Sequence, residues 1–170
     1  MSLKRKFKAA FLDRDGVINF DKGYINEFSK IKFRNGAIKG LKLLSKNKYL
    51  IFIITNQAGV AKGHISYGEL IKLNFELNKF FKNKKIKITK IEFCPHHPRG
   101  KVKKFKKKCK CRKPGNLMIK RILRRWRIEK RSSFMIGDNL KDKQAAVKSN
   151  LYFEYALPNF ESQIKNIILR

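Results

Sequence analysis

Short apolar runs alternate with longer amphipathic segments along the chain. The runs are rich in β-branched and aromatic residues and end at polar or glycine-containing turns, which predicts strands. The segments between them repeat apolar residues at three- and four-residue spacing, which is typical of helices with one buried face. The predicted strands are 8–12, 49–55, 86–93, 133–136 and 151–153, and the predicted helices are 36–46, 67–81, 116–127, 140–149 and 159–169.

This alternation predicts βαβ units and therefore an α/β fold, a Rossmann-like, mostly parallel sheet with helices on both faces. Ser66 and Glu69 stand at the spacing of a capping box, which strengthens the start of the second helix. Neither an internal repeat nor a linker is visible, so we expect a single domain over residues 1–170.

Composition supports a packed core, because 42% of the 170 residues are hydrophobic and 14 are Phe. The formal net charge of +31 is typical of nucleic-acid binding, but Lys and Arg lie along the whole chain and only 101–110 is a dense run. We therefore favour a solvated basic surface over a nucleic-acid interface. No apolar run is long enough to span a bilayer, and the N-terminus does not resemble a signal peptide, so we expect a cytoplasmic protein without a membrane partner.

Polar clusters follow four of the predicted strands. Asp13 and Asp15 come after the first strand, Thr55 and Asn56 after the second, a Cys- and His-containing segment after the third, and Asp138 after the fourth. Because ligands of open α/β sheets bind beyond the carboxyl ends of the strands, these loops predict one pocket.

The two aspartates suit phosphoryl transfer. Asp13 and Asp15 are two residues apart, so an extended backbone directs both carboxylates to one side, and one can attack phosphorus while the other moves protons. Asp138 would complete a Mg²⁺ site with hard oxygen ligands. Asp142, one helical turn later, either supports that metal site or favours the helix N-terminus, and we prefer the first interpretation.

Two further groups would stabilise a transferring phosphoryl group. Lys113 would neutralise its charge, and the Thr55 hydroxyl with the backbone amides of Asn56 and Gln57 would hold its oxygens.

Four segments together are similar to motifs of the haloacid dehalogenase superfamily, and within it to the D-glycero-D-manno-heptose 1,7-bisphosphate phosphatases. They are 11–19 (FLDRDGVIN), 55–63 (TNQAGVAKG), 111–114 (CRKP) and 135–138 (MIGD). The resemblance implies that Asp13 is a nucleophile, Asp15 a general acid and base, and Thr55 and Lys113 phosphoryl-stabilising residues. It also implies Mg²⁺ ligands from Asp13, Asp138 and the Asp15 backbone carbonyl. Implied substrate contacts come from Asp21, Lys22, Gly23, Tyr24, Asn56, Gln57, Arg112 and Asn139.

Three cysteines and a histidine offer the ligand set of a structural zinc site, at Cys94, His96, Cys109 and Cys111. Their spacing is not that of a zinc finger, and a surface loop with free thiols is the alternative. In the resembled family the zinc ligands fall at these positions. The long interval from Cys94 to Cys109 also favours the heptose enzymes over the related histidinol-phosphate phosphatases, whose loop is shorter.

The segment between Asp15 and Gly36 is too short to hold a cap domain, and we expect a monomer. The resemblance implies a phosphatase that acts on a sugar bisphosphate. The chain departs from the family at Ala58, at Asn139 and in a shortened link after Pro114. The shortened link puts the position of Lys113 in question. Rival hypotheses are a histidinol-phosphate phosphatase, a polynucleotide 3′-phosphatase and a zinc-stabilised nucleic-acid-binding protein without catalysis.

Overall fold

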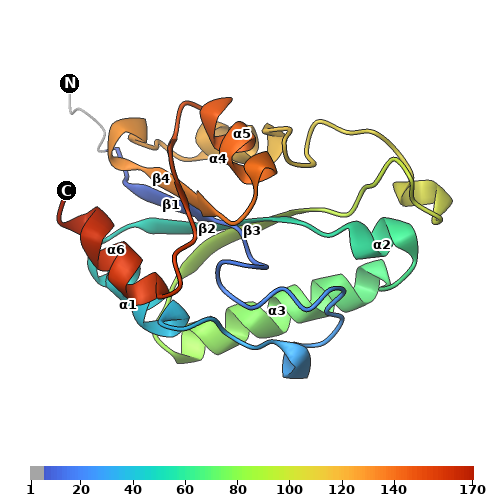
Figure 1. The fold of residues 1–170 in the computed structure, drawn as a ribbon, viewed down its shortest axis with the longest axis horizontal. Coiled ribbons are helices and arrows are strands. Elements are labelled where there is room, and N and C mark those ends of the chain that lie inside the picture. Colours follow the sequence, from blue (N-terminus) through green and yellow to red (C-terminus); the bar gives the residue numbers. More distant parts are fainter. Residues whose placement is uncertain (1–5) are drawn as a thin grey trace.

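A computed structural model describes residues 6–170 and contains a five-stranded parallel sheet with the order β3-β2-β1-β4-β5 (Figure 1). The strands are β1 (Ala9–Leu12), β2 (Leu50–Asn56), β3 (Ile88–Cys94), β4 (Phe134–Gly137) and β5 (Tyr152–Tyr155). The helices are α1 (Ala37–Lys46), α2 (Ala58–Lys62), α3 (Tyr67–Asn83), α4 (Leu117–Arg125), α5 (Leu140–Val147) and α6 (Phe160–Ile168). The predicted α/β class and its helix-covered parallel sheet are confirmed.

Alternate side chains of each strand point to opposite faces of the sheet, so the core has two parts, one on each face. Ala10 and Leu12 of β1 pack with buried residues of α1, α3 and α6, whereas Ala9 and Phe11 pack with those of α4 and α5. Figure 1 shows α1, α3 and α6 on one side of the sheet and α4 and α5 on the other. Because both faces are covered, β1 and β4 in the middle of the sheet are apolar and buried throughout, as is typical of parallel sheets.

The central strand β1 pairs with β2 on one side and β4 on the other, so the strand order reverses there. Open α/β sheets bind ligands at such a reversal, at the carboxyl ends of the strands. The loops after β1, β2 and β4 therefore meet at one edge.

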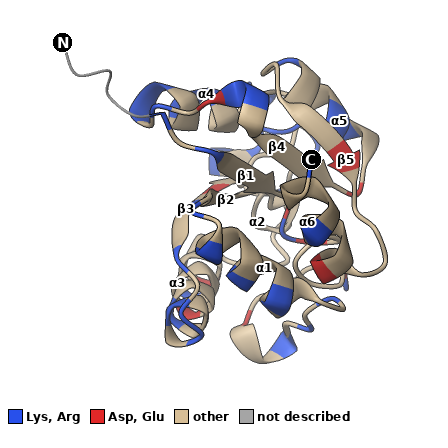
Figure 2. Cartoon of the chain, turned by 90° about the vertical axis from the view of Figure 1, so that its left-hand side faces the viewer, with Lys and Arg blue, Asp and Glu red and all other residues tan. Residues whose placement is uncertain are grey.

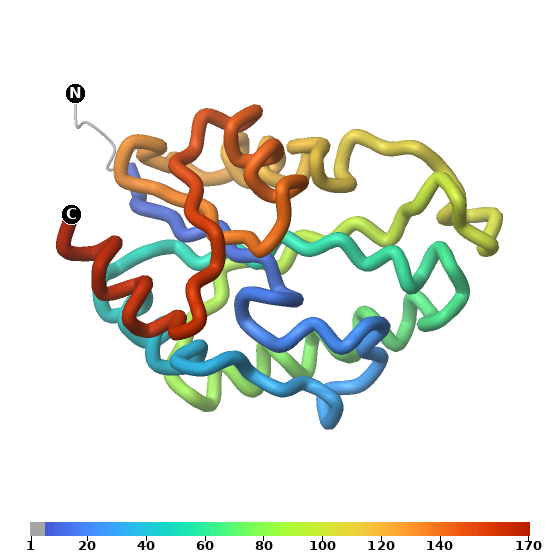
Figure 3. The backbone as a smooth tube through the Cα atoms, viewed as in Figure 1, coloured from blue at the N-terminus to red at the C-terminus, as the bar shows by residue number. Residues whose placement is uncertain are grey.

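The basic residues are spread over the outer surfaces of several helices in Figure 2, and the densest run lies in the loop between β3 and α4. That loop extends to the right of the tube in Figure 3, away from the two chain ends. Within residues 6–170, no helix has the length and apolar character needed to cross a bilayer.

Candidate active site

Asp13 and Lys113 form the buried base of the site. Asp13 directly follows β1 and is 5% exposed, and Lys113 is 2% exposed. The Lys113 ammonium lies 2.9 Å from Oδ2 of Asp13 and 2.6 Å from Oδ1 of Asp142, and donates to the Ile54 carbonyl at 2.7 Å. Two carboxylates and one carbonyl therefore surround the buried ammonium, so its charge is neutralised by ion pairs.

Asn56 holds the Lys113 backbone through two reciprocal hydrogen bonds. Its Nδ2 donates to the Lys113 carbonyl at 3.1 Å, and the Lys113 N–H donates to its Oδ1 at 3.0 Å. The shortened link after Pro114 therefore does not displace Lys113 from Asp13. Asn56 was expected to contact substrate, and its side chain is instead occupied by this pairing.

Burial dominates the ionisation of Asp13. It raises the pKa of the Asp13 carboxyl to about 7, although the nearby Lys113 charge opposes the rise. Asp142 and Asp15 add to the rise because they are like charges. A divalent cation against this carboxylate would favour its ionised form.

Asp15 lies in a very different environment from Asp13. It accepts hydrogen bonds from Nε and Nη2 of Arg14 at 3.0 and 2.9 Å, from Asn19 Nδ2 at 2.9 Å and from Gln57 Nε2 at 2.8 Å. Burial alone would raise the pKa of Asp15, but the Arg14 charge and these hydrogen bonds hold it below its usual value. The two neighbouring carboxyls therefore differ in proton affinity in the metal-free protein.

Asp13 also belongs to a cluster of three carboxylates. Oxygen atoms of Asp13, Asp138 and Asp142 lie within 4.8 Å of one another. Asp142 is completely buried and also closes a capping box at the start of α5, where the Asn139 N–H donates to its Oδ2 at 3.1 Å. Both roles weighed for Asp142 therefore have contacts that support them. Hard oxygen donors of this kind fit Mg²⁺.

Thr55 and Gln57 close the floor of the cavity. Gln57 Nε2 donates to Thr55 Oγ1 at 2.8 Å, which leaves the hydroxyl proton of Thr55 for another acceptor. The expectation that the Gln57 backbone amide holds phosphoryl oxygens is wrong. That amide donates to the Cys94 carbonyl at 2.8 Å because it extends the hydrogen bonding between β2 and β3.

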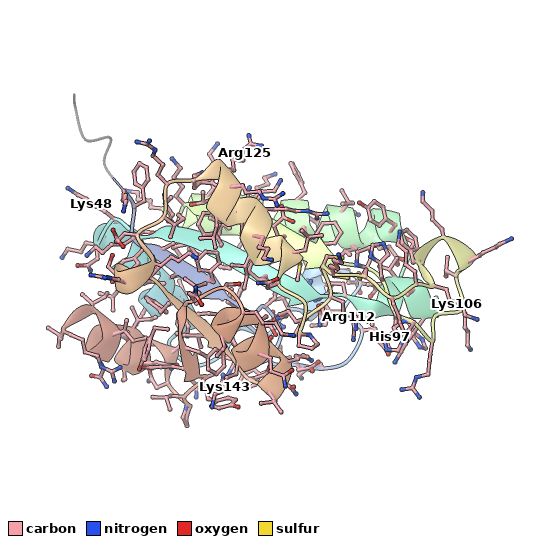
Figure 4. The ribbon with its side chains drawn as sticks, turned by 90° about the horizontal axis from the view of Figure 1, so that it is seen from above. Lys48, His97, Lys106, Arg112, Arg125 and Lys143 are labelled. Carbon is pink, nitrogen blue, oxygen red and sulfur yellow. The ribbon has the colours of Figure 1, made fainter. Side chains whose placement is uncertain are left out.

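The cavity above these groups has a volume of about 270 Å³. Its lining comprises Asp13, Asp15, Asp21, Gly23, Tyr24, Thr55, Asn56, Gln57, Ala58, Gly59, Asp138 and Lys141. Of the expected site residues, Lys22, Arg112, Lys113 and Asn139 are not part of this lining. Lys113 reaches the site from beneath Asp13, whereas Arg112 donates to the His96 carbonyl at 3.4 Å, where the loop between β3 and α4 returns to the body (Figure 4).

Tyr24 forms one wall of the cavity and is held by groups that the sequence patterns did not connect. Its ring stacks on His64 with centroids 4.3 Å apart, and its hydroxyl accepts from Lys62 at 2.9 Å. A Cβ at Gly59 would lie 2.8 Å from the Tyr24 ring, so only glycine allows this close approach.

The four predicted zinc ligands lie together at the base of the long loop. Sulfur atoms of Cys94, Cys109 and Cys111 are 3.2 to 3.4 Å apart, and Nδ1 of His96 is 3.4 Å from the Cys111 sulfur and 3.7 Å from that of Cys94. Tetrahedral zinc with Zn–S bonds of about 2.3 Å separates its sulfur ligands by about 3.8 Å. The cluster therefore has the ligand set and nearly the spacing of a structural zinc site.

Lys141 and Arg14 were missed by the sequence-based prediction. Arg14 is fully buried despite its charge, because its side chain pairs with Asp15. Lys141 lines the cavity from the first turn of α5. No sequence pattern separates this lysine from the many others along the chain.

Residues 110–153 match the model of the HAD-hydrolase-like family. The chain is 35% identical over 149 residues to the D-glycero-beta-D-manno-heptose-1,7-bisphosphate 7-phosphatase of Escherichia coli K12, covering 88% of this chain and 78% of that protein. It is 36% identical over 140 residues to the enzyme of the same name from Haemophilus influenzae, covering 82% and 76%.

A solved structure is similar over nearly the whole fold. It is the D,D-heptose 1,7-bisphosphate phosphatase from B. bronchiseptica, complexed with magnesium and phosphate. Its TM-score to this chain is 0.84 at 21% identity, with coverage of 96% of this chain and 99% of the other.

Proposed function

The chain belongs to the D-glycero-beta-D-manno-heptose-1,7-bisphosphate 7-phosphatase family of HAD-like hydrolases, and we propose that it removes the C7 phosphate of heptose 1,7-bisphosphate as a single-domain enzyme. One observation carries the proposal beyond family membership. Asp13 is held at the base of a cavity by a buried lysine, beside a second carboxyl that Arg14 and Gln57 orient. This arrangement suits nucleophilic attack on phosphorus followed by hydrolysis.

The reaction divides into two displacements at phosphorus. In the first, a carboxylate oxygen of Asp13 bonds to phosphorus, the bond from phosphorus to the sugar oxygen breaks, and Asp15 gives that oxygen a proton. In the second, water attacks the phosphoaspartyl phosphorus while Asp15 accepts a proton from it. Asp13 is then regenerated and inorganic phosphate is released.

Asp15 must bind a proton before it can act as the acid. In the free protein Arg14, Asn19 and Gln57 stabilise its ionised form. A bound phosphate places negative charge beside Asp15 and raises its proton affinity, because like charges disfavour ionisation. The hydrogen bonds from Arg14 and Gln57 keep the carboxyl aimed into the cavity in both steps.

Lys113 and Thr55 would stabilise the transferring phosphoryl group. Lys113 carries its charge directly behind Asp13, and Thr55 has a hydroxyl proton to donate. Preorganised donors of this kind contribute because they need no rearrangement as charge develops.

Mg²⁺ fits the oxygen donors at this edge of the sheet. Asp13, Asp138 and the backbone carbonyl of Asp15 would hold it, and Asp142 would remain paired with Lys113. When bound, it would neutralise the phosphate charge and keep Asp13 ionised.

The proposal includes zinc at Cys94, His96, Cys109 and Cys111. Bound there, it would hold the long basic loop between β3 and α4 in one conformation. Burial raises the pKa of the Cys94 thiol, and a cation is what allows such a buried thiol to ionise. His96→Asn should lower zinc content measured by mass spectrometry. His97→Asn is the matched control, because His97 lies next in the chain but outside the cluster.

Substrate would be covered by loops alone, which are residues 21–24, residues 56–64 and the Lys-rich loop between β3 and α4. The substrate contacts expected from Asp21, Lys22, Gly23, Tyr24, Arg112 and Asn139 belong to this proposal. A monomeric, cytoplasmic enzyme belongs to the same proposal. Light scattering of the purified protein and fractionation of cells test these two points.

Phosphate release with Mg²⁺ tests the function. Heptose 1,7-bisphosphate should be turned over far faster than histidinol phosphate or a 3′-phosphorylated oligonucleotide. Asp13→Asn should abolish turnover, whereas Glu27→Gln, which removes an exposed carboxylate outside the cavity lining, should retain it. Wild-type protein that releases no phosphate, or an active Asp13→Asn variant, would overturn the proposal.

A further inference from the structure

The cavity has an unusual balance of charge for a site that takes a phosphorylated sugar. Among the described residues, its lining includes the carboxylates of Asp13, Asp15, Asp21 and Asp138 and the ammonium of Lys141 as its basic group. A bisphosphate entering it meets mostly negative charge, so the position of each cation matters.

The deeper cations are already paired with acids of the site. Lys113 lies between Asp13 and Asp142, and Arg14 makes a two-point contact with Asp15. Their charges neutralise carboxylates at the base of the cavity, where the transferred phosphoryl group would lie against Asp13. They leave the second phosphate of a bisphosphate without a partner.

Lys141 is the basic residue of the described cavity lining. It is partly exposed, and within residues 6–170 no carboxylate forms a salt bridge with it. It lines the same cavity as Asp138, which precedes it by three residues. Lys141 therefore stands on the Asp138 side of the cavity.

The backbone that presents Lys141 is fixed. Asn139 caps α5, its Oδ1 accepts the Lys141 N–H at 3.3 Å, and Asp142 completes the capping box. Asn139 is committed to this cap, and Arg112 lies outside the lining. The first turn of α5 thus brings Lys141 into the cavity lining, with no salt-bridge partner among residues 6–170.

Resting on the function proposed above, we propose that Lys141 binds the phosphate of the sugar bisphosphate that is not transferred. It is then a specificity residue, since it favours bisphosphates over monophosphates. A hydrogen bond to a charged group contributes enough to change affinity by about tenfold or more, even after discounting for partial exposure.

Steady-state kinetics with two substrates test the assignment. Lys141→Met should raise the KM for heptose 1,7-bisphosphate about tenfold, with kcat within about twofold because the groups that act on phosphorus are unchanged. The KM for heptose 7-phosphate, which lacks the second phosphate, should not change. Lys141→Arg keeps the positive charge and should therefore raise the KM for the bisphosphate much less than Lys141→Met does.

Lys143→Met is the matched control. Lys143 lies on the same helix, outside the cavity lining, and its ammonium is 5.9 Å from the Tyr155 ring centroid (Figure 4). It should leave both KM values unchanged. Equal effects of Lys141→Met on both substrates, or no effect on either, would overturn the inference.

Equilibrium binding separates this inference from the proposed function. Calorimetry on an Asp13→Asn background, with the same two sugar phosphates, should show that Lys141→Met weakens binding of the bisphosphate only. If the wild type releases no phosphate, the proposed function fails, and this binding difference still decides the role of Lys141. Equal affinities with and without Lys141 would refute it.

Discussion

Replacing Lys113 by methionine separates the stabilising and chemical roles of the buried ion pairs. Met has similar length and suits a buried site, but it leaves Asp142 completely buried without its partner at 2.6 Å. Removing one member of a buried pair costs about 3–5 kcal/mol. For a chain of this size, that corresponds to a decrease in Tm of roughly 6–20 °C.

The same substitution removes the cation behind Asp13. Loss of one preorganised electrostatic group lowers turnover by about 10²–10³-fold. Thermal unfolding and phosphate release at a temperature well below the lowest Tm measure the two effects separately.

A second substitution, Asp142→Asn, distinguishes the roles. The introduced amide removes the orphaned charge yet keeps an oxygen that can accept from the Asn139 N–H in the capping box. The double variant should recover a large part of the lost stability, because replacing both members of a buried pair is often close to neutral. It should recover no turnover. A single variant that is destabilised by less than about 1 kcal/mol, or a double variant that regains activity, would refute this reasoning.

Other predictions concern the metal sites and the turn after β1. A Cβ at Gly16 would lie 2.1 Å from Oδ2 of Asp138, whereas Gly23, with the same φ of +83°, has nothing within 4 Å. Gly16→Ala should therefore weaken Mg²⁺ binding measured by calorimetry, while Gly23→Ala should cost only about 1 kcal/mol of backbone strain in thermal unfolding; equal Mg²⁺ affinities would contradict this. Because burial raises the pKa of Asp13 to about 7, Mg²⁺ affinity should fall by about tenfold per pH unit below 7. In the metal-free protein the folded state binds this proton and the unfolded state does not, so stability should fall as pH rises from about 4 to about 7; pH-independent binding and unfolding would count against the buried carboxyl. Cys109→Ser should release most of the zinc and lower Tm by about 5 °C, and unchanged metal content in mass spectrometry would eliminate Cys109 as a ligand.

The strands and long helices could be predicted because burial on both faces imposes the patterns that the sequence carries. The predicted helix 140–149 and the observed α5 (Leu140–Val147) start at the same residue, where the Asn139 cap defines the N-terminus. α2 (Ala58–Lys62) was not predicted, because five residues are too few to reveal a helical period.

Some residues of the candidate site could also be predicted from the sequence, and others could not. Asp13, Asp15 and Asp138 could be found because each follows a strand that ends at one edge of the sheet. Lys141 and the bond from the Gln57 amide to Cys94 could not, because they depend on side-chain direction and on the exact end of the pairing between β2 and β3.

Acid-quench labelling tests the central claim most directly, that Asp13 is transiently phosphorylated. Wild-type protein mixed with Mg²⁺ and a bisphosphate labelled with ³²P at C7 should carry a hydroxylamine-sensitive label that maps to the peptide containing Asp13. The Asp13→Asn variant should carry none. Steady release of phosphate without any such label, or label on a peptide that lacks Asp13, would contradict the account.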